Sequence, residues 1–336
     1  MGLGPPVRLF GARLQLSCLR PISNVEQLYL LTMLAIVGIL LVFIAVLGGY
    51  MLESGNPYVL LQPAEIVIVL GAAVGIVLVS NRPAAIRKMW TGVLLVFQPS
   101  PHTPGRFQRH LRMLYEAFSY AQRAGMSELE RDVESPEQSR IFSQYPEFLS
   151  DETTRDFICD SLRMLVIGAT TPNELDHMMD LDIDVQRRGY HESAGALSAV
   201  ADALPGLGIV AAVLGVVLTM QAIGGSPESV GQKVAAALVG TFLGILLCYG
   251  VVGPVASRLD SLSEQRAQFL QVLRIAVVSF ARGASPILAV EYARRSIPVE
   301  LRPAFLEMEA SIKREARIPP APAPPGMEGH AAATNG

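Results

Sequence analysis

Four long apolar segments constrain what this chain can fold into: Leu28–Leu47, Ala64–Val79, Leu204–Ile223 and Val234–Val255. A helix needs about 20 mostly apolar residues to cross roughly 30 Å of hydrocarbon, and the second segment is the shortest of the four. The composition agrees, because 51% of the residues are hydrophobic, 17% are charged and the mean hydropathy is +0.38, outside the usual range of soluble domains. We therefore predict an all-α, polytopic membrane protein with four transmembrane helices.

Basic residues predict how these spans are oriented. Arg82 and Lys88 follow the second span and Arg258 follows the fourth, whereas the two short connections between spans hold one basic residue, Lys233. Because basic residues near spans are retained in the cytoplasm, both termini and the long connection 81–200 should be cytoplasmic. The two short turns should then lie outside.

The chain is expected to divide along these spans. The divisions are an N-terminal extension (1–32), spans one and two (33–80), a cytoplasmic domain (81–200), spans three and four (201–256), cytoplasmic C-terminal helices (257–315) and a disordered tail rich in Pro and Ala (316–336). The extension is neither apolar enough to span nor patterned like a helix. Because Met33 directly precedes a sufficient first span, we expect that the natural start codon is Met33.

The cytoplasmic domain should be helical. In "RFQRHLRMLYEAFSYAQRAGM" the apolar residues recur at one-turn spacing and form one stripe. Its members are Phe107, Leu111, Leu114, Tyr115, Phe118 and Ala121. "DETTRDFICDSLRMLVIGA" repeats the pattern, and a third helix, Glu174–Leu197, is expected to run toward the third span. After the fourth span a further helix should continue until Gly283 and Pro286 end it.

Small residues in the spans indicate close helix packing. In lipid, helices associate where small side chains let the backbones approach. The rows are Gly208, Ala212 and Gly215 on the third span, Gly240 and Gly244 on the fourth, and Gly71 and Gly75 on the second. Such rows serve either packing within one subunit or contacts between subunits, and the sequence leaves both open. Three rows in one chain predict a closely packed assembly of several helices.

Three polar or conformational features fall in the spans. Pro205 and Pro254 lie at the cytoplasmic ends of spans three and four, where they either form a hinge or mark a helix start and a tolerated kink. Thr241 is the strongly polar residue inside the fourth span. Its hydroxyl either lines an ion path or bonds back to its own helix.

Charged residues are absent from the middle of every span. Glu65 lies at the outer edge of the second span, from where it is expected to reach the interface. A proton needs an ionisable relay to cross hydrocarbon, so if the protein conducts ions, another polypeptide must supply the carboxylate.

Other function classes find no support in the sequence. Cys18, Cys159 and Cys248 stand alone, and the five histidines are scattered, so neither a disulfide framework nor a metal site is predicted. The net charge of −3 shows no basic face, and we expect no nucleic-acid partner. Phosphate loops, nucleophile elbows and paired carboxylates are missing, so we expect no enzyme and no cofactor.

Several ordered motifs resemble the MotA-type flagellar stator proteins of the MotA/TolQ/ExbB proton channel family. They are "LLQPAEIVIVLGAAVG", "GMSELERDVESPEQSRIFSQYP", "LPGLGIVAAVLGVV", "VGTFLGILLCYGVVGP" and "SPILAVEYARRSIP". The resemblance covers roughly Met33–Glu309 and implies an inner-membrane subunit surrounded by lipid. It also implies a ring of five such subunits around two MotB-type chains, whose transmembrane aspartate supplies the missing carboxylate.

The resemblance implies roles for individual residues. Pro205 and Pro254 match the prolines that couple the partner's aspartate to movement of the cytoplasmic domain. Glu130, otherwise interpreted as a solvated charge, matches the acidic residue that engages the rotor protein FliG. The family's basic contact falls on Gln122 here, so Arg123, one position away, either replaces it or the contact differs.

The resemblance also predicts the coupling ion and names an alternative function. Thr241 matches a path-lining threonine, whereas Ala212 stands where sodium-driven relatives carry a second threonine. A path lined by fewer hydroxyl oxygens is a poorer substitute for the hydration shell of a sodium ion. We therefore predict that protons are the coupling ion. The alternatives are an ExbB or TolQ-type energiser of the outer membrane, which usually has three spans and lacks the "ERDVESP" region, and a non-conducting membrane scaffold.

Overall fold

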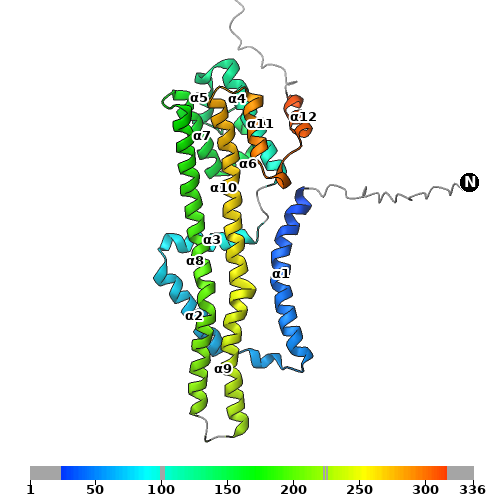
Figure 1. The fold of residues 1–336 in the computed structure, drawn as a ribbon, viewed down its shortest axis with the longest axis vertical. Helices are drawn as coiled ribbons and strands as arrows, with labels where there is room; N and C mark the ends of the chain where they lie inside the picture. The colour runs from blue at the N-terminus through cyan, green and yellow to red at the C-terminus, as the bar shows by residue number, and fades with distance from the viewer. Residues whose placement is uncertain (1–23, 99–102, 222–223, 225, 316–336) are drawn as a thin grey trace, which may run out of the picture. The chain divides into compact units, whose positions relative to one another are not determined.

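The computed structural model describes residues 24–98, 103–221, 224 and 226–315, and they form helices throughout (Figure 1). The main helices are α1 (Asn24–Leu52), α2 (Pro63–Ser80), α3 (Pro83–Val96), α4 (Pro104–Ala124), α5 (Met126–Glu134), α6 (Pro146–Ser150), α7 (Glu152–Ile167), α8 (Pro172–Met220), α9 (Pro227–Leu247), α10 (Gly253–Ala281), α11 (Pro286–Ser296) and α12 (Phe305–Glu315). Short helical turns are η1 (Pro57–Leu60), η2 (Phe142–Gln144), η3 (Cys248–Val252) and η4 (Val299–Leu301). The predicted tail and N-terminal extension lie outside the described residues, apart from 24–32.

The chain forms two compact units. One combines residues 1–100 with 191–262 and is called the membrane unit below; the other combines residues 101–190 with 263–336 and is called the helical domain. The C-terminal helices therefore pack into the same compact unit as α4 to α7 and the first part of α8.

The membrane unit holds the predicted spans. Helices long and apolar enough to cross a membrane are found at Leu34–Leu52 and Pro57–Ser80, and within Pro172–Met220 and Pro227–Ala281, which confirms four spans. The predicted helix Glu174–Leu197 does run on into the third span, because α8 continues without a break to Met220. The fourth span is not one regular helix, since α9 ends at Leu247 and the π-helical turn η3 follows.

The helical domain is held together by the predicted apolar stripe of α4. Phe107, Leu111, Leu114 and Phe118 are buried, and Tyr115 is partly buried against the same core. The rings of Phe118 and Phe280 are stacked with centroids 4.3 Å apart, so α4 is packed against α10. Phe157, Ile158 and Leu162 bury the corresponding face of α7 in this core. Figure 1 shows α4, α5, α7 and α11 gathered around the upper part of α10.

Helix ends in this domain follow local sequence signals. Thr103 caps α4, accepting a hydrogen bond from the Arg106 backbone N–H, and Asp151 caps α7 through Thr154. After α10, Gly283 adopts a φ of 88°, which glycine reaches at little cost, and Pro286 opens α11 as its first residue. The predicted end of this helix at Gly283 and Pro286 is thus confirmed.

Candidate functional site

Helices α8 and α9 approach each other at glycine residues. A Cβ atom added to Gly208 would lie 2.7 Å from the carbonyl oxygen of Gly240, and one added to Gly244 would lie 2.5 Å from that of Leu204. A Cβ at Gly215 would lie 2.8 Å from the Cα of Ala237. Because these neighbours are backbone atoms, a larger side chain could fit only if the helices moved apart. The small residues of spans three and four therefore bring the two backbones into direct contact.

The predicted row of small residues on α8 is wrong at one position, Ala212. Ala211, which is fully buried, faces Gly240, with 2.9 Å between the Ala211 Cβ and a Cβ added to Gly240. Ala212 is only half-buried, so the row that packs is Gly208, Ala211 and Gly215. Positions three and four residues apart both lie one turn along a helix, and only the geometry of the helix pair decides which of them faces the partner.

The glycine pair of the second span has no such contact. A Cβ at Gly71 or Gly75 would meet no atom within 4 Å in the described part of the chain, and both glycines are exposed. The apolar side chains of Leu70, Val74 and Leu78 are exposed beside them. This face of α2 is therefore left for lipid or for another subunit.

Thr241 and Ala212 lie at the same level of the α8–α9 pair. Gly240, which precedes Thr241, contacts Ala211 and the backbone of Ala212. Thr241 is half-buried. The hydroxyl of Thr219 on α8 donates a hydrogen bond to the Gly215 carbonyl of its own helix at 2.8 Å.

Glu65 does not reach the interface, contrary to expectation. It is 6% exposed, and its Oε2 atom is buried with no hydrogen-bond partner in the described chain. Oε2 lies 2.5 Å from the position of a Cβ added to Gly240, so the carboxyl group is packed against the middle of α9. The pairing of α2 with α9 causes this burial, and a single sequence does not reveal helix pairing. The one sequence feature that could have indicated a buried carboxyl group was the acidic residue within the apolar stretch "QPAEIVIV".

Both prolines interrupt helical hydrogen bonding. Pro205 lies inside α8, which rules out its interpretation as a helix start. Pro254 lies in the first turn of α10, directly after η3, where the Gly253 N–H donates to the carbonyl of Cys248. A proline inside a helix removes one hydrogen bond, and π-helical turns mark positions where a helix is irregular, often at functional sites. The fourth span thus carries two irregular features next to each other.

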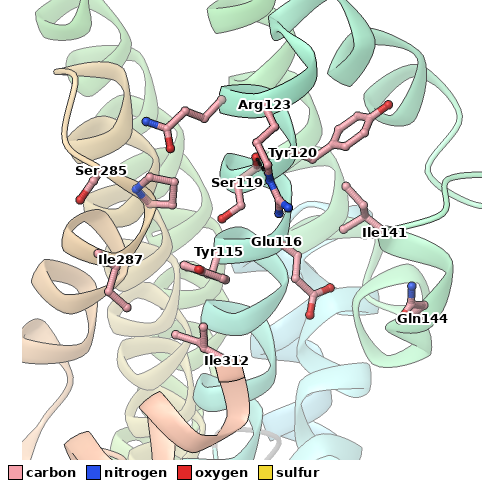
Figure 2. A pocket seen from close by; sticks show the side chains of 12 residues that line it. Tyr115, Glu116, Ser119, Tyr120, Arg123, Ile141, Gln144, Ser285, Ile287 and Ile312 are labelled. Carbon is pink, nitrogen blue, oxygen red and sulfur yellow. Dashed lines mark hydrogen bonds between the residues drawn. The ribbon is translucent and has the colours of Figure 1, made fainter. Parts of the chain in front are cut away.

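The expected rotor-contact residues are exposed on the helical domain. Leu129 and Val133 bury one face of α5, so that Glu130 points away from the core. Arg123, near the end of α4, is exposed and donates a hydrogen bond from Nε to the Ser119 carbonyl at 3.1 Å. Arg123 and Gln122 also line an open pocket of about 700 Å³ between α4 and the start of α11 (Figure 2). Arg123 is therefore the cation available on this surface at the position next to Gln122.

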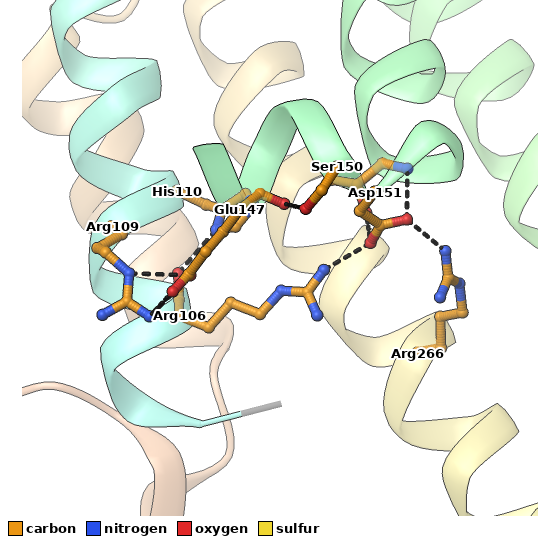
Figure 3. Close-up of polar contacts among 8 residues, drawn as sticks. Arg106, Arg109, His110, Glu147, Ser150, Asp151 and Arg266 are labelled. Atoms are coloured by element: carbon orange, nitrogen blue, oxygen red, sulfur yellow. Dashed lines mark hydrogen bonds and ion pairs between the residues drawn. The ribbon is translucent and has the colours of Figure 1, made fainter. Parts of the chain in front are cut away.

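A buried charge cluster joins three segments of the helical domain. Asp151 accepts hydrogen bonds from Arg106 at 2.5 Å and from Arg266 at 2.8 Å (Figure 3). Burial would raise the pKa of Asp151, but Arg266, Thr154 and Arg106 together lower it to about 2. The carboxylate is therefore charged at neutral pH and ties α4 to α10. No local sequence pattern predicts this cluster, because its members are far apart in the chain.

His110 lies beside this cluster and is almost fully buried. Its Nδ1 atom is 2.9 Å from the Arg106 carbonyl, and because a carbonyl can only accept, Nδ1 carries the proton. The ring meets Phe148 and Phe269 edge-on. Burial lowers the pKa of His110 to about 4, so the imidazole is neutral in the folded protein.

The described residues lack the ligand sets that hold metal ions in proteins. They contain no group of three His, Cys, Asp or Glu side chains that could hold a metal ion. Cys159 and Cys248 are both buried free thiols.

Comparison with known proteins places this architecture in a family. The family model described as Motility protein A N-terminal matches residues 36–125, and that of the MotA/TolQ/ExbB proton channel family matches residues 149–271. Motility protein A of Salmonella typhimurium and that of Escherichia coli are each 37% identical over 281 residues, which is 84% of this chain and 95% of the relative. Chemotaxis protein LafT of Vibrio parahaemolyticus is 33% identical over 81% of this chain and 95% of its own.

Solved structures have the same fold. The C. jejuni MotAB structure matches with a TM-score of 0.66 and 20% identity, covering 79% of this chain and 96% of the matched chain. The flagellar MotAB stator complex from Bacillus subtilis matches with a TM-score of 0.65 and 22% identity, covering 80% and 97%. Together with the sequence relatives, these matches show that the chain belongs to the MotA/TolQ/ExbB proton channel family, in its motility protein A group.

Proposed function

We propose that this chain is a flagellar stator subunit that works with a MotB-type partner to couple proton flow across the inner membrane to torque on the rotor. One observation carries the proposal: in a chain 37% identical to motility protein A, the close α8–α9 pair holds Thr241 at the level of Ala212. Pro205 lies on α8, and η3 with Pro254 follows directly after α9 in the same span. The protein does work through an ion gradient and needs no enzymatic chemistry or cofactor.

The ion path runs along the α8–α9 pair in this proposal. The partner contributes a transmembrane aspartate, and the half-buried Thr241 and Ala212 face the path. Because a methyl group replaces a second hydroxyl at Ala212, the path offers few oxygens to a dehydrated sodium ion. Protons, which need only the carboxylate and water, are the coupling ion.

Coupling to movement uses the two prolines. Protonation of the partner's aspartate changes the charge beside α8 and α9, and it favours one of two arrangements of these helices. Pro205 and Pro254 let the helices bend where hydrogen bonds are already missing. Each charge that crosses 100 mV releases about 2.3 kcal/mol, enough to shift a balanced two-state equilibrium strongly.

Torque is delivered by the helical domain. With both termini and this domain in the cytoplasm, exposed Glu130 and Arg123 contact the charged rim of the rotor protein FliG. Five subunits surround two partner chains, and the exposed glycine face of α2 supports contacts outside the subunit. Electrostatic contacts at such a rim steer association more than they add affinity.

The experiment that tests this function is a deletion of the gene, with filaments counted by microscopy and outer-membrane import assayed in the same cells. Filaments that are present but motionless, with normal import, would support the stator function. Normal swimming with failed import or a leaky envelope would contradict it and assign the protein to the ExbB or TolQ-type energisers. Complementation by the intact chain controls for effects on neighbouring genes.

A further inference from the structure

Glu65 is the one charged side chain buried within the membrane-spanning helices that the structure describes. It is contributed by the first turn of α2 and is 6% exposed. Its Oε2 atom is inaccessible to solvent and has no hydrogen-bond partner among the described residues. The mechanism described above does not use it, although an ionisable group inside a span marks an ion path more often than a structural site.

The position of Glu65 relates it to the ion path. Its Oε2 atom occupies the space beside Gly240, where a Cβ would come within 2.5 Å of it. Gly240 directly precedes Thr241, and the same added Cβ would lie 3.3 Å from the backbone nitrogen of Ala212. The carboxyl group therefore lies at the level of both path-lining residues, separated from them by a glycine that has no side chain.

No charged residue on the described helices packed around Glu65 forms an ion pair with its carboxyl group. The Glu65 Oε2 atom lies beside Gly240, which carries no charge. The charged residues of the packed helices lie elsewhere: Glu228 and Lys233 are exposed on the first two turns of α9, and Asp202 is exposed on α8. Glu53 is exposed before η1, and Arg82, Arg87 and Lys88 follow the other end of α2.

An unpaired carboxylate in such a place is costly. Moving a charged carboxyl group out of water costs several kcal/mol even after relaxation, and a partner or a bound proton is needed to offset it. A residue kept only for packing would cost less as an apolar side chain of similar size. The burial of Glu65 therefore indicates a group that binds and releases a proton.

We propose that Glu65 is a second proton-exchanging group of the stator, supplied by this chain itself on the entry side of the path. The carboxylate takes a proton from a hydronium ion and leaves water. The resulting carboxylic acid passes that proton to the partner's aspartate, directly or through one water, and returns to the carboxylate. Glu65 then sets how readily the complex loads protons when they are scarce, while the partner's aspartate remains the group that drives movement.

Gly240 is part of this site. An alanine at this position would place a methyl group against the Glu65 Oε2 atom and the Ala211 Cβ atom, so the carboxyl group would have to leave its present position. Glycine keeps the route between Glu65 and the face bearing Thr241 open. The small residue thus serves proton access as well as helix packing.

The inference rests on the proposed function and is tested by Glu65→Gln in the complete complex with its partner. This variant keeps the shape of the side chain and cannot release a proton in the same way. We expect normal assembly, near-normal rotation at acidic external pH, and a loss of rotation rate of at least threefold at alkaline external pH. Glu228→Gln, which removes an exposed carboxylate on the same side of the membrane, should leave the profile unchanged.

Two further measurements decide the remaining outcomes. Proton uptake by vesicles that contain the complex should show the same alkaline loss, and Glu65→Asp, which keeps a carboxyl group, should restore most of it. If the Gln variant does not assemble, the Asp variant decides: an assembled Asp variant that loses rotation at alkaline pH by threefold or more, although it keeps a carboxyl group, would overturn the proposal. An unchanged profile in an assembled Gln variant would also overturn it. If wild-type rotation itself does not depend on protons, the proposed function fails instead.

Discussion

At the scale of single residues, backbone atoms of α9 occupy the space where a side chain at Gly208 would lie. Gly208→Ala places a methyl group 2.7 Å from the Gly240 carbonyl oxygen, which cannot move aside as a side chain would. We expect a loss of stability of about 1–3 kcal/mol, which is typical of overpacking, and weaker rotation. The midpoint of thermal unfolding of the purified complex measures the first effect and the speed of single motors the second.

Gly206→Ala is the matched control for this substitution. It lies two residues away on the same helix, and a Cβ at Gly206 meets nothing within 4 Å in the described chain. Alanine is favoured over glycine inside a helix, so this variant should be as stable as the wild type or slightly more stable. Equal losses in both variants would show that the close contact with α9 is not the reason for glycine at position 208.

His110 predicts how the helical domain responds to acid. Its pKa is about 4 in the folded protein, below the ordinary value of 6.5, because the ring is buried. The unfolded chain therefore binds a proton first as the pH falls, and stability is lost between about pH 6.5 and 4. The whole shift corresponds to about 3 kcal/mol. His110→Phe should flatten the stability profile in this window, measured by hydrogen exchange of the α4 amides in the full chain.

Two comparisons test this interpretation. The exposed His177 should keep the wild-type profile when it is replaced by glutamine. The pKa of Asp151 is lowered to about 2. Its contribution to the free energy of unfolding is therefore complete above about pH 4 and is lost only as the pH falls from there toward about 2. A profile that stays steep between pH 6.5 and 4 in His110→Phe would mean that another group is responsible.

At the scale of elements, substitutions of the prolines of α8 and α10 should have opposite effects on rotation and on thermal stability. Pro254→Ala and Pro205→Ala restore a backbone N–H in each helix, and a proline inside a helix costs about 3 kcal/mol. We expect equal or greater thermal stability, normal assembly with the partner, and loss of rotation. Thermal unfolding and motor speed are measured on the same variants. Pro286→Ala, at the start of α11, should change neither assembly nor rotation.

A structural role for the prolines would give the opposite pattern. The variants would then lose stability and rotation together, or would rotate normally. The combination of higher stability and lost rotation is specific to a bend that the mechanism needs.

Local patterns explain which elements could be predicted from the sequence. The apolar length of the spans and the stripe from Phe107 to Ala121 depend on neighbours within a few turns, so both were visible. The burial of Glu65 depends on which helix α2 meets, and the choice of Ala211 over Ala212 depends on how α8 is rotated against α9. The η3 turn and the Arg106–Asp151–Arg266 cluster likewise arise only after distant segments pack.

At the scale of the whole molecule, exposed charges on the helical domain should decide contact with the rotor. Glu130→Arg should reduce rotation strongly, because the contact would become repulsive, while the fold should change by less than about 0.5 kcal/mol at an exposed site. Reversal of the facing charge on FliG should restore rotation. The measurement is motor speed together with the amount of membrane-bound complex.

Glu128→Arg is the control for this reversal, since Glu128 is exposed on the same short helix. Arg123→Glu tests whether Arg123 replaces the basic contact that Gln122 lacks. Normal rotation of both Glu130→Arg and Arg123→Glu would remove this surface from the rotor contact.

The most direct test of the central claim is recovery of rotation in single motors of a deletion strain as the chain is expressed again. Rotation should return in equal speed steps, one for each stator complex that assembles. It should stop when the proton gradient is removed at constant membrane voltage and sodium concentration. A speed that follows the sodium gradient would contradict proton coupling, and motors that rotate at full speed before expression begins would contradict the stator function itself.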